Sequence, residues 1–113
     1  MNLINYEFKG AVLILYFPGV AKINILSSSE LEKEILKITG GSDAKEINFD
    51  LSNIKYIDST GFSLLKSFAA KMAINEIKFH VTNENEELAE LFKLVDLDYL
   101  IIKKCLTIKK FNL

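Results

Sequence analysis

The sequence predicts an α/β protein with a mixed sheet of four to five strands and helices packed against it. Two kinds of segment support this prediction. Short segments in which apolar residues alternate or run together indicate strands, and longer segments with apolar residues at every third or fourth position indicate helices. A third observation is their order, β-β-α-β-α-β-α-β, because strands that alternate with helices pair in parallel through right-handed crossovers. Residues 1–113 are expected to form a single domain.

The first two strands are expected to form a hairpin. Apolar and polar residues alternate from Ile4 to Phe8, Lys9-Gly10 supplies a turn, and the segment from Ala11 to Phe17 is almost entirely apolar. The first strand therefore suits an edge of the sheet, with one face in water. The second strand has apolar residues on both sides, which predicts burial on both faces in the centre of a mixed sheet.

An apolar connection follows the hairpin. It runs from Val20 to Leu26, and Lys22 is its one charged residue. We expect Ile23, Ile25 and Leu26 to tuck under the first helix as a hydrophobic staple. If these side chains were exposed instead, they would mark a contact with a partner or with lipid.

Serine residues start the first helix. Ser27 and Ser29 each have a glutamate three residues later and so fit the capping box, in which a hydroxyl and a carboxylate satisfy free backbone N–H groups. Apolar residues then recur with helical spacing from Leu31 to Ile38, and Gly40-Gly41 supplies the stop. This segment is predicted to be an amphipathic cover for the sheet.

A third strand leads into the most informative stretch of the sequence. Ile47 to Leu51 alternates, and a turn at Ser52-Asn53 precedes the motif Asp58-Ser59-Thr60-Gly61. The side-chain oxygens of Asp58, Ser59 and Thr60 could each cap the following helix by accepting from its free N–H groups. A hydroxyl at such a helix start also lies where backbone donors and the helix dipole stabilise a phosphate. Ser59 is therefore part of a cap or a phosphorylation switch.

The remaining segments continue the alternation of helices and strands. Phe62 to Ile74 carries an apolar stripe with helical spacing, and after a polar break Ile77 to Val81 alternates as a fourth strand. Asn83, with Glu86 three residues later, is expected to cap a third helix. The last segment, Tyr99 to Ile108, is apolar enough for a final edge strand protected by lysines.

Composition limits the function and the location. The chain is 50% hydrophobic and 26% charged, and its net charge of −1 comes from 14 basic and 15 acidic residues, so no direct nucleic-acid binding is expected. The longest apolar run, Ala11 to Phe17, is too short to cross a bilayer, which takes about 20 residues. Cys105 is the single cysteine, and the N-terminus lacks the basic region of a signal peptide. These features predict a cytoplasmic protein without a transmembrane segment.

The sequence gives little support to catalysis. A nucleophilic Ser59 would need a base, and the one histidine, His80, lies on the predicted fourth strand. Ile57 stands where a Gly-x-Ser-x-Gly elbow would have glycine. His and Cys residues are not spaced like the ligands of a metal site. A glycine-rich loop that binds phosphate opens a helix, whereas Gly40-Gly41 ends one. We therefore expect no enzyme activity, no metal and no cofactor.

Two segments resemble a known family. The segment from Ile47 to Phe62 is similar to the signature of STAS domains, the bacterial anti-sigma-factor antagonists, and the run from Leu91 to Asp98 resembles that family's third helix and exit. The resemblance extends over essentially the whole chain. It implies a STAS-like fold and a regulatory protein that binds another protein.

The resemblance also implies a partner and a modification. In that family the unphosphorylated domain binds an anti-sigma factor that is also a serine kinase and so frees a sigma factor for transcription, and phosphorylation breaks the complex. The family's phosphoacceptor is the serine directly after the aspartate, which is Ser59 here. Asp58, Thr60 and Gly61 complete the motif and the helix cap. A phosphate would add about −1.5 to −2 charges inside the interface.

The surface that the resemblance assigns to the partner includes the loop after the second strand and the start of the second helix. In this chain it gives Lys22, Asn24, Ser63 and Lys66. The loop differs from the family pattern, which usually has an acidic residue soon after Gly19. An interaction module of a sensory or lipid-transport assembly, without phosphorylation, therefore stays open as an alternative. Self-association into a homo-oligomer through the first strand also stays open.

Overall fold

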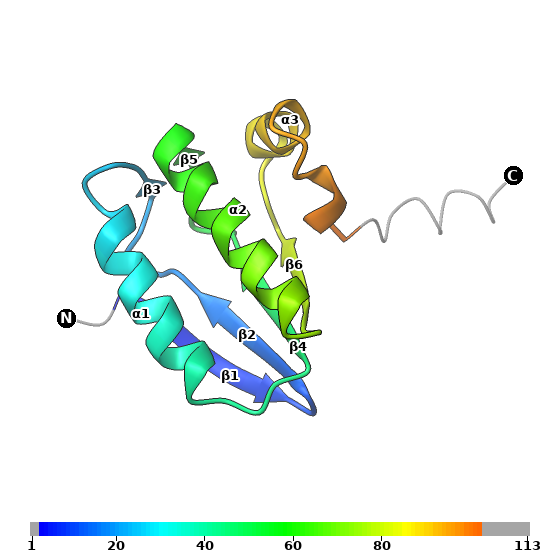
Figure 1. The fold of residues 1–113 in the computed structure, drawn as a ribbon. Coiled ribbons are helices and arrows are strands. Elements are labelled where there is room, and N and C mark those ends of the chain that lie inside the picture. The colour runs from blue at the N-terminus through cyan, green and yellow to red at the C-terminus, as the bar shows by residue number, and fades with distance from the viewer. Residues whose placement is uncertain (1–2, 103–113) are drawn as a thin grey trace, which may run out of the picture.

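The structure is a computed structural model, and it describes residues 3–102 (Figure 1). A hairpin is followed by strands that alternate with helices. The elements are β1 (Asn5–Lys9), β2 (Val12–Tyr16), β3 (Lys22–Ile23), α1 (Ser28–Gly40), β4 (Glu46–Asp50), β5 (Tyr56–Ile57), α2 (Ser59–Ile74), β6 (Lys78–Thr82), α3 (Glu86–Leu94) and a short 3₁₀ helix, η1 (Asp98–Leu100).

The main sheet has four strands in the order β1-β2-β4-β6. β1 pairs antiparallel with β2, whereas β2 with β4 and β4 with β6 pair in parallel. The register places Leu15 beside Phe49 and Phe49 beside Val81, and these side chains are at most 1% exposed. The predicted mixed sheet is therefore confirmed, with β1 at its edge.

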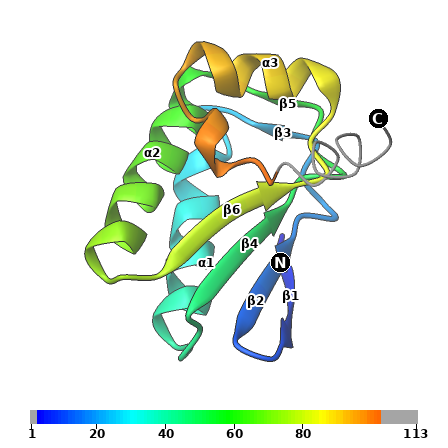
Figure 2. The same cartoon turned by 90° about the vertical axis from the view of Figure 1, so that its right-hand side faces the viewer.

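The helices define the layers of the fold. Figure 2 shows α1 and α2 along one face of the sheet and α3 at its upper end, next to β5. Phe68 of α2 stacks on Phe49 of β4 with ring centroids 5.2 Å apart, so the core lies between α2 and the sheet. Among the described residues, no helix has both the length and the apolar character needed to cross a membrane.

The prediction that the second strand is buried on both faces is wrong. Leu13 and Leu15 of β2 are 0% exposed, whereas Val12, Ile14 and Tyr16 stay partly exposed. The reason is that α1 and α2 lie along one face of the sheet only (Figure 2), and the full burial of Leu13 and Leu15 places them on that face. An apolar strand can therefore be central in a sheet and still have one face in partial contact with water.

The uncovered face of the sheet carries paired polar side chains. His80 Nε2 lies 2.5 Å from Glu46 Oε2 on the neighbouring strand. The Tyr16 hydroxyl donates to Glu7 Oε2 over 2.6 Å. This hydrogen bond, with smaller effects of burial and of the charges of Glu7 and Asp50, raises the pKa of the Tyr16 phenol above its ordinary value.

A second, two-stranded sheet was not predicted. β3 pairs in parallel with β5, with Lys22 opposite Tyr56 and Ile23 opposite Ile57. The two isoleucines are buried and the other two residues are exposed. Strands of two residues are too short to show a periodic pattern, so this pair could not be predicted from residue types. The pair matters because it joins the apolar connection to the start of α2.

The helix starts differ in part from the predicted caps. Ser27 occupies the N-cap position of α1 but makes no side-chain cap hydrogen bond, so neither capping box forms. The cap of α3 is Asn85, whose Oδ1 accepts from the N–H of Leu88 over 2.8 Å. Asn83, the predicted cap, is outside the helix and its side chain donates to Asp50.

Glu84 lies between these two asparagines. Its Oε1 is buried without a hydrogen-bond partner among the described residues. Burial raises the pKa of the Glu84 carboxyl, and a backbone hydrogen bond partly opposes that effect. The fold therefore disfavours the charged form of this side chain.

The end of the described chain only begins the predicted last strand. Asp98–Leu100 is a 3₁₀ helix rather than a strand, and Ile101 then forms a single parallel bridge with Val81 of β6. The rest of the predicted strand, from Lys103 to Ile108, lies outside the described residues, as does Cys105.

Candidate functional site

The motif Asp58–Gly61 lies at the junction of β5 and α2. Asp58 has extended backbone geometry and is the N-cap of α2. Its Oδ1 accepts from the N–H of Gly61 over 2.9 Å, and its backbone carbonyl accepts from the N–H of Phe62 over 2.9 Å. Of the candidate caps, Asp58 therefore fills that role.

Ser59 is the first residue of α2, and it is exposed. Thr60 follows it and is partly buried. The free N–H groups and the positive end of the dipole of this 16-residue helix lie at the same place. The site can therefore present a hydroxyl to another protein and can tolerate a negative group on it.

Gly61 allows α2 to approach β3 closely. A Cβ atom at this position would lie 2.7 Å from the backbone oxygen of Ile23, 2.7 Å from Cγ2 of Ile57 and 2.9 Å from Cγ2 of Ile23. These distances are shorter than any normal contact between such atoms. The absence of a side chain at position 61 thus holds the helix start against the apolar connection.

The apolar connection ends in a turn that we call the Ile25–Leu26 tip. Ile25 is 71% exposed and Leu26 is 88% exposed, whereas Ile23 is 2% exposed. The predicted burial of all three residues is therefore confirmed for Ile23 and wrong for the other two. Asn24 Oδ1 accepts from the N–H groups of Leu26 and Ser27 over 3.0 and 3.2 Å, and this turn directs the tip away from the core.

Asp58 connects the tip to the motif. Its Oδ2 accepts from the N–H of Ile25 over 3.3 Å, and its own N–H donates to the Ile23 carbonyl over 3.0 Å. Both oxygens of the carboxylate therefore bind backbone N–H groups, one in the helix and one in the tip. This link could not be predicted from the sequence, because a backbone donor in a loop leaves no mark in the residue types.

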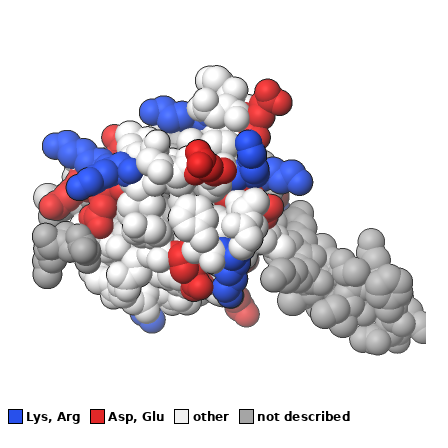
Figure 3. All heavy atoms as spheres, turned by 90° about the horizontal axis from the view of Figure 1, so that it is seen from below, with Lys and Arg blue, Asp and Glu red and all other residues white. Residues whose placement is uncertain are grey.

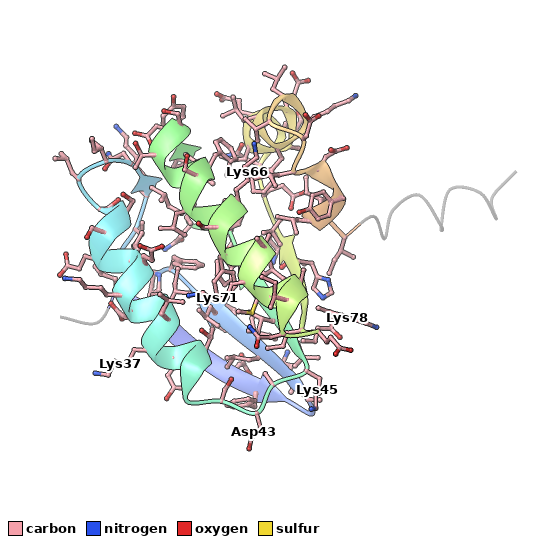
Figure 4. The ribbon with its side chains drawn as sticks, in the orientation of Figure 1. Lys37, Asp43, Lys45, Lys66, Lys71 and Lys78 are labelled. Carbon is pink, nitrogen blue, oxygen red and sulfur yellow. The ribbon has the colours of Figure 1, made fainter. Side chains whose placement is uncertain are left out.

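Of the four residues predicted to contact a partner, three are exposed and one is partly buried. Ser63 and Lys66 are exposed and follow Ser59 at helical spacing on α2, with Lys66 on the upper half of the helix (Figure 4). Lys22 is exposed on β3. Asn24 is partly buried, and its side-chain oxygen is occupied within the tip. Asn24 therefore shapes the loop.

The sequence of this chain matches a known protein family. The family model for the STAS domain matches residues 4–110. The chain belongs to the STAS domain family. The family and the fold that the sequence resemblance implied are therefore confirmed.

Solved structures with the same fold include proteins of two kinds. One is the anti-sigma factor antagonist SpoIIAA of Bacillus in its unphosphorylated form (TM-score 0.72, 11% identity, 96% of this chain and 96% of that chain). Another is an anti-sigma factor antagonist from Mycobacterium paratuberculosis (TM-score 0.73, 21% identity, 87% and 80%). The second kind is the murine anion transporter Slc26a9 (TM-score 0.65, 15% identity). That match covers 82% of this chain and 14% of the transporter chain. At these identities the likeness shows the fold alone.

A catalytic Ser59 would need a base near it, and in this STAS domain His80 has another partner. His80 lies on β6, and its Nε2 pairs with the Glu46 carboxylate of the neighbouring strand β4. The ring of His80 is therefore engaged with Glu46, and none of the hydrogen bonds of the described residues joins it to Ser59. Across residues 3–102, no group of three or more His, Cys, Asp or Glu side chains is arranged to hold a metal ion.

A shallow hollow of about 450 Å³ borders the site between β5 and α3. Its apolar members are Tyr56, Leu91 and Leu94, and glutamates 86, 87 and 90 form the rest of its lining. Glu86 and Glu87 lie in the first turn of α3, where carboxylates stabilise the helix dipole. The helix start therefore explains two of these three glutamates, Glu86 and Glu87.

The end of the STAS domain opposite the motif is built by the turns that join β1 to β2, α1 to β4 and α2 to β6 (Figure 1). Lysines and acidic residues are interspersed on this lower end (Figure 3). Lys37 and Lys78 point outward on opposite sides of it (Figure 4). A hollow of about 960 Å³ lies between the last turns of α1 and α2. Because lysines and acidic residues are interspersed, the lower end seen in Figure 3 has no extensive patch of one charge.

Proposed function

We propose that this STAS domain is an anti-sigma factor antagonist that acts in the bacterial cytoplasm. It binds an anti-sigma factor with serine kinase activity and so regulates sigma-factor-dependent transcription. The observation that carries this proposal is the exposed Ser59 at the first position of α2, directly after the Asp58 cap. Two antagonists with this fold add support, and SpoIIAA has structures in unphosphorylated and phosphorylated forms.

The proposed switch follows from the place of the hydroxyl. In the kinase complex, Ser59 Oγ attacks the terminal phosphorus of bound ATP, the bond to ADP breaks, and the hydroxyl proton passes to the kinase. The product carries about −1.5 to −2 charges next to the Asp58 carboxylate. The free N–H groups of α2 stabilise the phosphate within the domain, so the fold survives. The partner surface loses affinity because bulk and charge now occupy it.

The proposal is tested with Ser59→Asp and Ser59→Ala beside the wild type. Each variant is used to capture partners from the source cell, and the native protein is weighed by intact mass spectrometry. We expect wild type and Ser59→Ala to capture an anti-sigma factor, Ser59→Asp to lose it by at least tenfold, and a phosphate mass to be absent from Ser59→Ala. Ala70→Asp, an exposed position further along α2, controls for added charge. Equal capture by wild type and Ser59→Asp would refute the switch.

The second candidate is an interaction module of a sensory or lipid-transport assembly that is not phosphorylated. Two observations favour it: the exposed Ile25–Leu26 tip, and the same fold in a murine anion transporter. In that case all Ser59 variants capture the same membrane or scaffold complex, and no phosphate is found. The motif is then a helix cap only.

A further inference from the structure

We propose that β1 is a docking edge for a second copy of this chain, which pairs with it antiparallel around Phe8 and joins the two four-stranded sheets into one. The inference goes beyond the proposed function, because β1 contains none of the residues assigned to the anti-sigma factor. The two copies would be related by a twofold axis, so each offers the other the same surface.

The first support is the direction of the backbone groups of β1. This strand is the edge of the main sheet, and a two-residue turn joins it to β2, with Lys9 opposite Val12. Residues that flank such a turn form a hydrogen-bonded pair, and the two kinds of pair then alternate along the hairpin. The N–H and C=O groups of Tyr6 and Phe8 therefore point away from β2. Within residues 3–102 no other backbone group binds them.

The second support is the apolar surface beside this edge. The register places Tyr6 opposite Leu15. It places Phe8 opposite Leu13. Because both leucines are 0% exposed, the two aromatic side chains lie on the buried face of the sheet, yet Tyr6 is 56% and Phe8 51% exposed. A second β1 would continue this layer, since Phe8 then lies opposite Phe8 of the second copy, and cross-strand aromatic pairs stabilise a sheet.

The charges of β1 favour a second copy as the occupant and select its register. Pairing around Phe8 places Glu7 opposite Lys9 of the second copy, and Lys9 opposite its Glu7. Pairing around Glu7 would instead set two carboxylates against each other, and pairing around Tyr6 would give neither charge an opposite partner. Inside the described part of the chain, Glu7 and Lys9 form no ion pair. The segment Glu7-Phe8-Lys9 is thus complementary to itself in an antiparallel pair.

The dimer is tested by sedimentation equilibrium of the full chain across a hundredfold range of concentration. We expect the wild type to form a reversible dimer, because a strand of five residues gives a small interface. Glu7→Lys or Lys9→Glu alone should weaken it at least tenfold, since each places like charges opposite each other. The double variant Glu7→Lys/Lys9→Glu restores opposite charges and should return to within threefold of the wild-type affinity.

A matched control is Lys55→Glu, which reverses an exposed charge beside β5 and should leave the dimer within twofold of wild type. A wild type that stays monomeric throughout overturns the second copy as the occupant of this edge and leaves the proposed function intact. Equal dimerisation of all variants overturns the edge as the contact.

Mixing the two single variants tests the register itself. Glu7→Lys carries two lysines on β1 and Lys9→Glu carries two glutamates, so only a heterodimer brings opposite charges together. We expect the mixture to associate at least tenfold more tightly than either variant alone. A mixture as monomeric as its components would overturn the pairing around Phe8.

Amide hydrogen exchange followed by NMR locates the contact on the chain. The N–H of Glu7 bonds within the hairpin at every concentration, whereas the N–H of Phe8 bonds only to the second copy. We expect dimerisation to slow the exchange of Phe8 at least tenfold, and by a larger factor than that of Glu7. A dimer in which the exchange of Phe8 is unchanged uses another surface and overturns the proposal.

Discussion

At the scale of single residues, position 61 shows how closely packing controls the site. The fold leaves no room for a Cβ there, since the backbone oxygen of Ile23 would lie 2.7 Å away. Alanine favours a helix over glycine by about 1 kcal/mol. The steric cost of an added methyl group in a full site is about 1–3 kcal/mol, so the clash is expected to outweigh that preference.

Gly61→Ala is therefore predicted to lower the free energy of unfolding by about 1–2 kcal/mol, as measured in urea. The control is Gly40→Ala, because a Cβ at Gly40 meets nothing within 4 Å. That substitution should stabilise the domain by up to about 1 kcal/mol. Equal stability of Gly61→Ala and wild type would show that the helix start can shift away from β3.

Glu84 gives a prediction about pH at the same scale. Burial raises the pKa of its carboxyl, so the unfolded chain loses this proton at lower pH than the folded chain. This group therefore lowers stability as pH rises from about 4.3, the ordinary glutamate pKa, through the raised pKa of the folded state.

Glu84→Gln is expected to be more stable than wild type at pH 7, by no more than about 1 kcal/mol because the side chain is partly exposed. The advantage should disappear below about pH 4, where both states of the wild type are protonated. Urea unfolding at both pH values measures it, with Glu90→Gln as the control, because Glu90 is exposed and lies beyond the first turn of α3. An advantage of the same size at low pH would point to packing rather than to charge.

At the scale of elements, periodic segments were predictable and their ends were not. The long helices and the five-residue strands show clear patterns, and they form where the sequence predicts them. The pair β3 and β5 has only two residues in each strand and depends on contacts between distant segments. The cap of α3 was misplaced because Asn83 and Asn85 are both good capping residues, and only the observed geometry distinguishes them.

This assignment predicts that Asn85→Ala destabilises the domain by about 0.5–2 kcal/mol, since the N–H of Leu88 loses its partner. Asn85→Asp should be tolerated, because aspartate caps as well and its charge suits the helix dipole. Chemical denaturation of the three proteins measures the difference. Equal stability of Asn85→Ala and wild type would mean that this bond adds nothing.

At the scale of the whole molecule, the sequence could indicate the layers but not which face stays open. The apolar residues on both sides of β2 predicted two covers, and the structure has one. The motif itself was predictable from residue types and spacing. The tip was not, because an apolar loop has the same pattern whether its side chains are buried or exposed. Tyr6 and Phe8 are more than half exposed on the edge strand, and self-association through it remains a prediction.

The separation of the two ends of the domain has a practical consequence. The residues proposed to bind a partner gather at the upper end, whereas the connection from α1 to β4 lies at the lower end, where Gly41 and Asp43 are exposed. Exposed loops that carry few contacts accept inserted sequence well. An affinity tag or a fluorophore placed between Gly41 and Asp43, before the buried Ala44, would therefore let the domain be immobilised or followed in a cell while the surface proposed to bind the anti-sigma factor stays free.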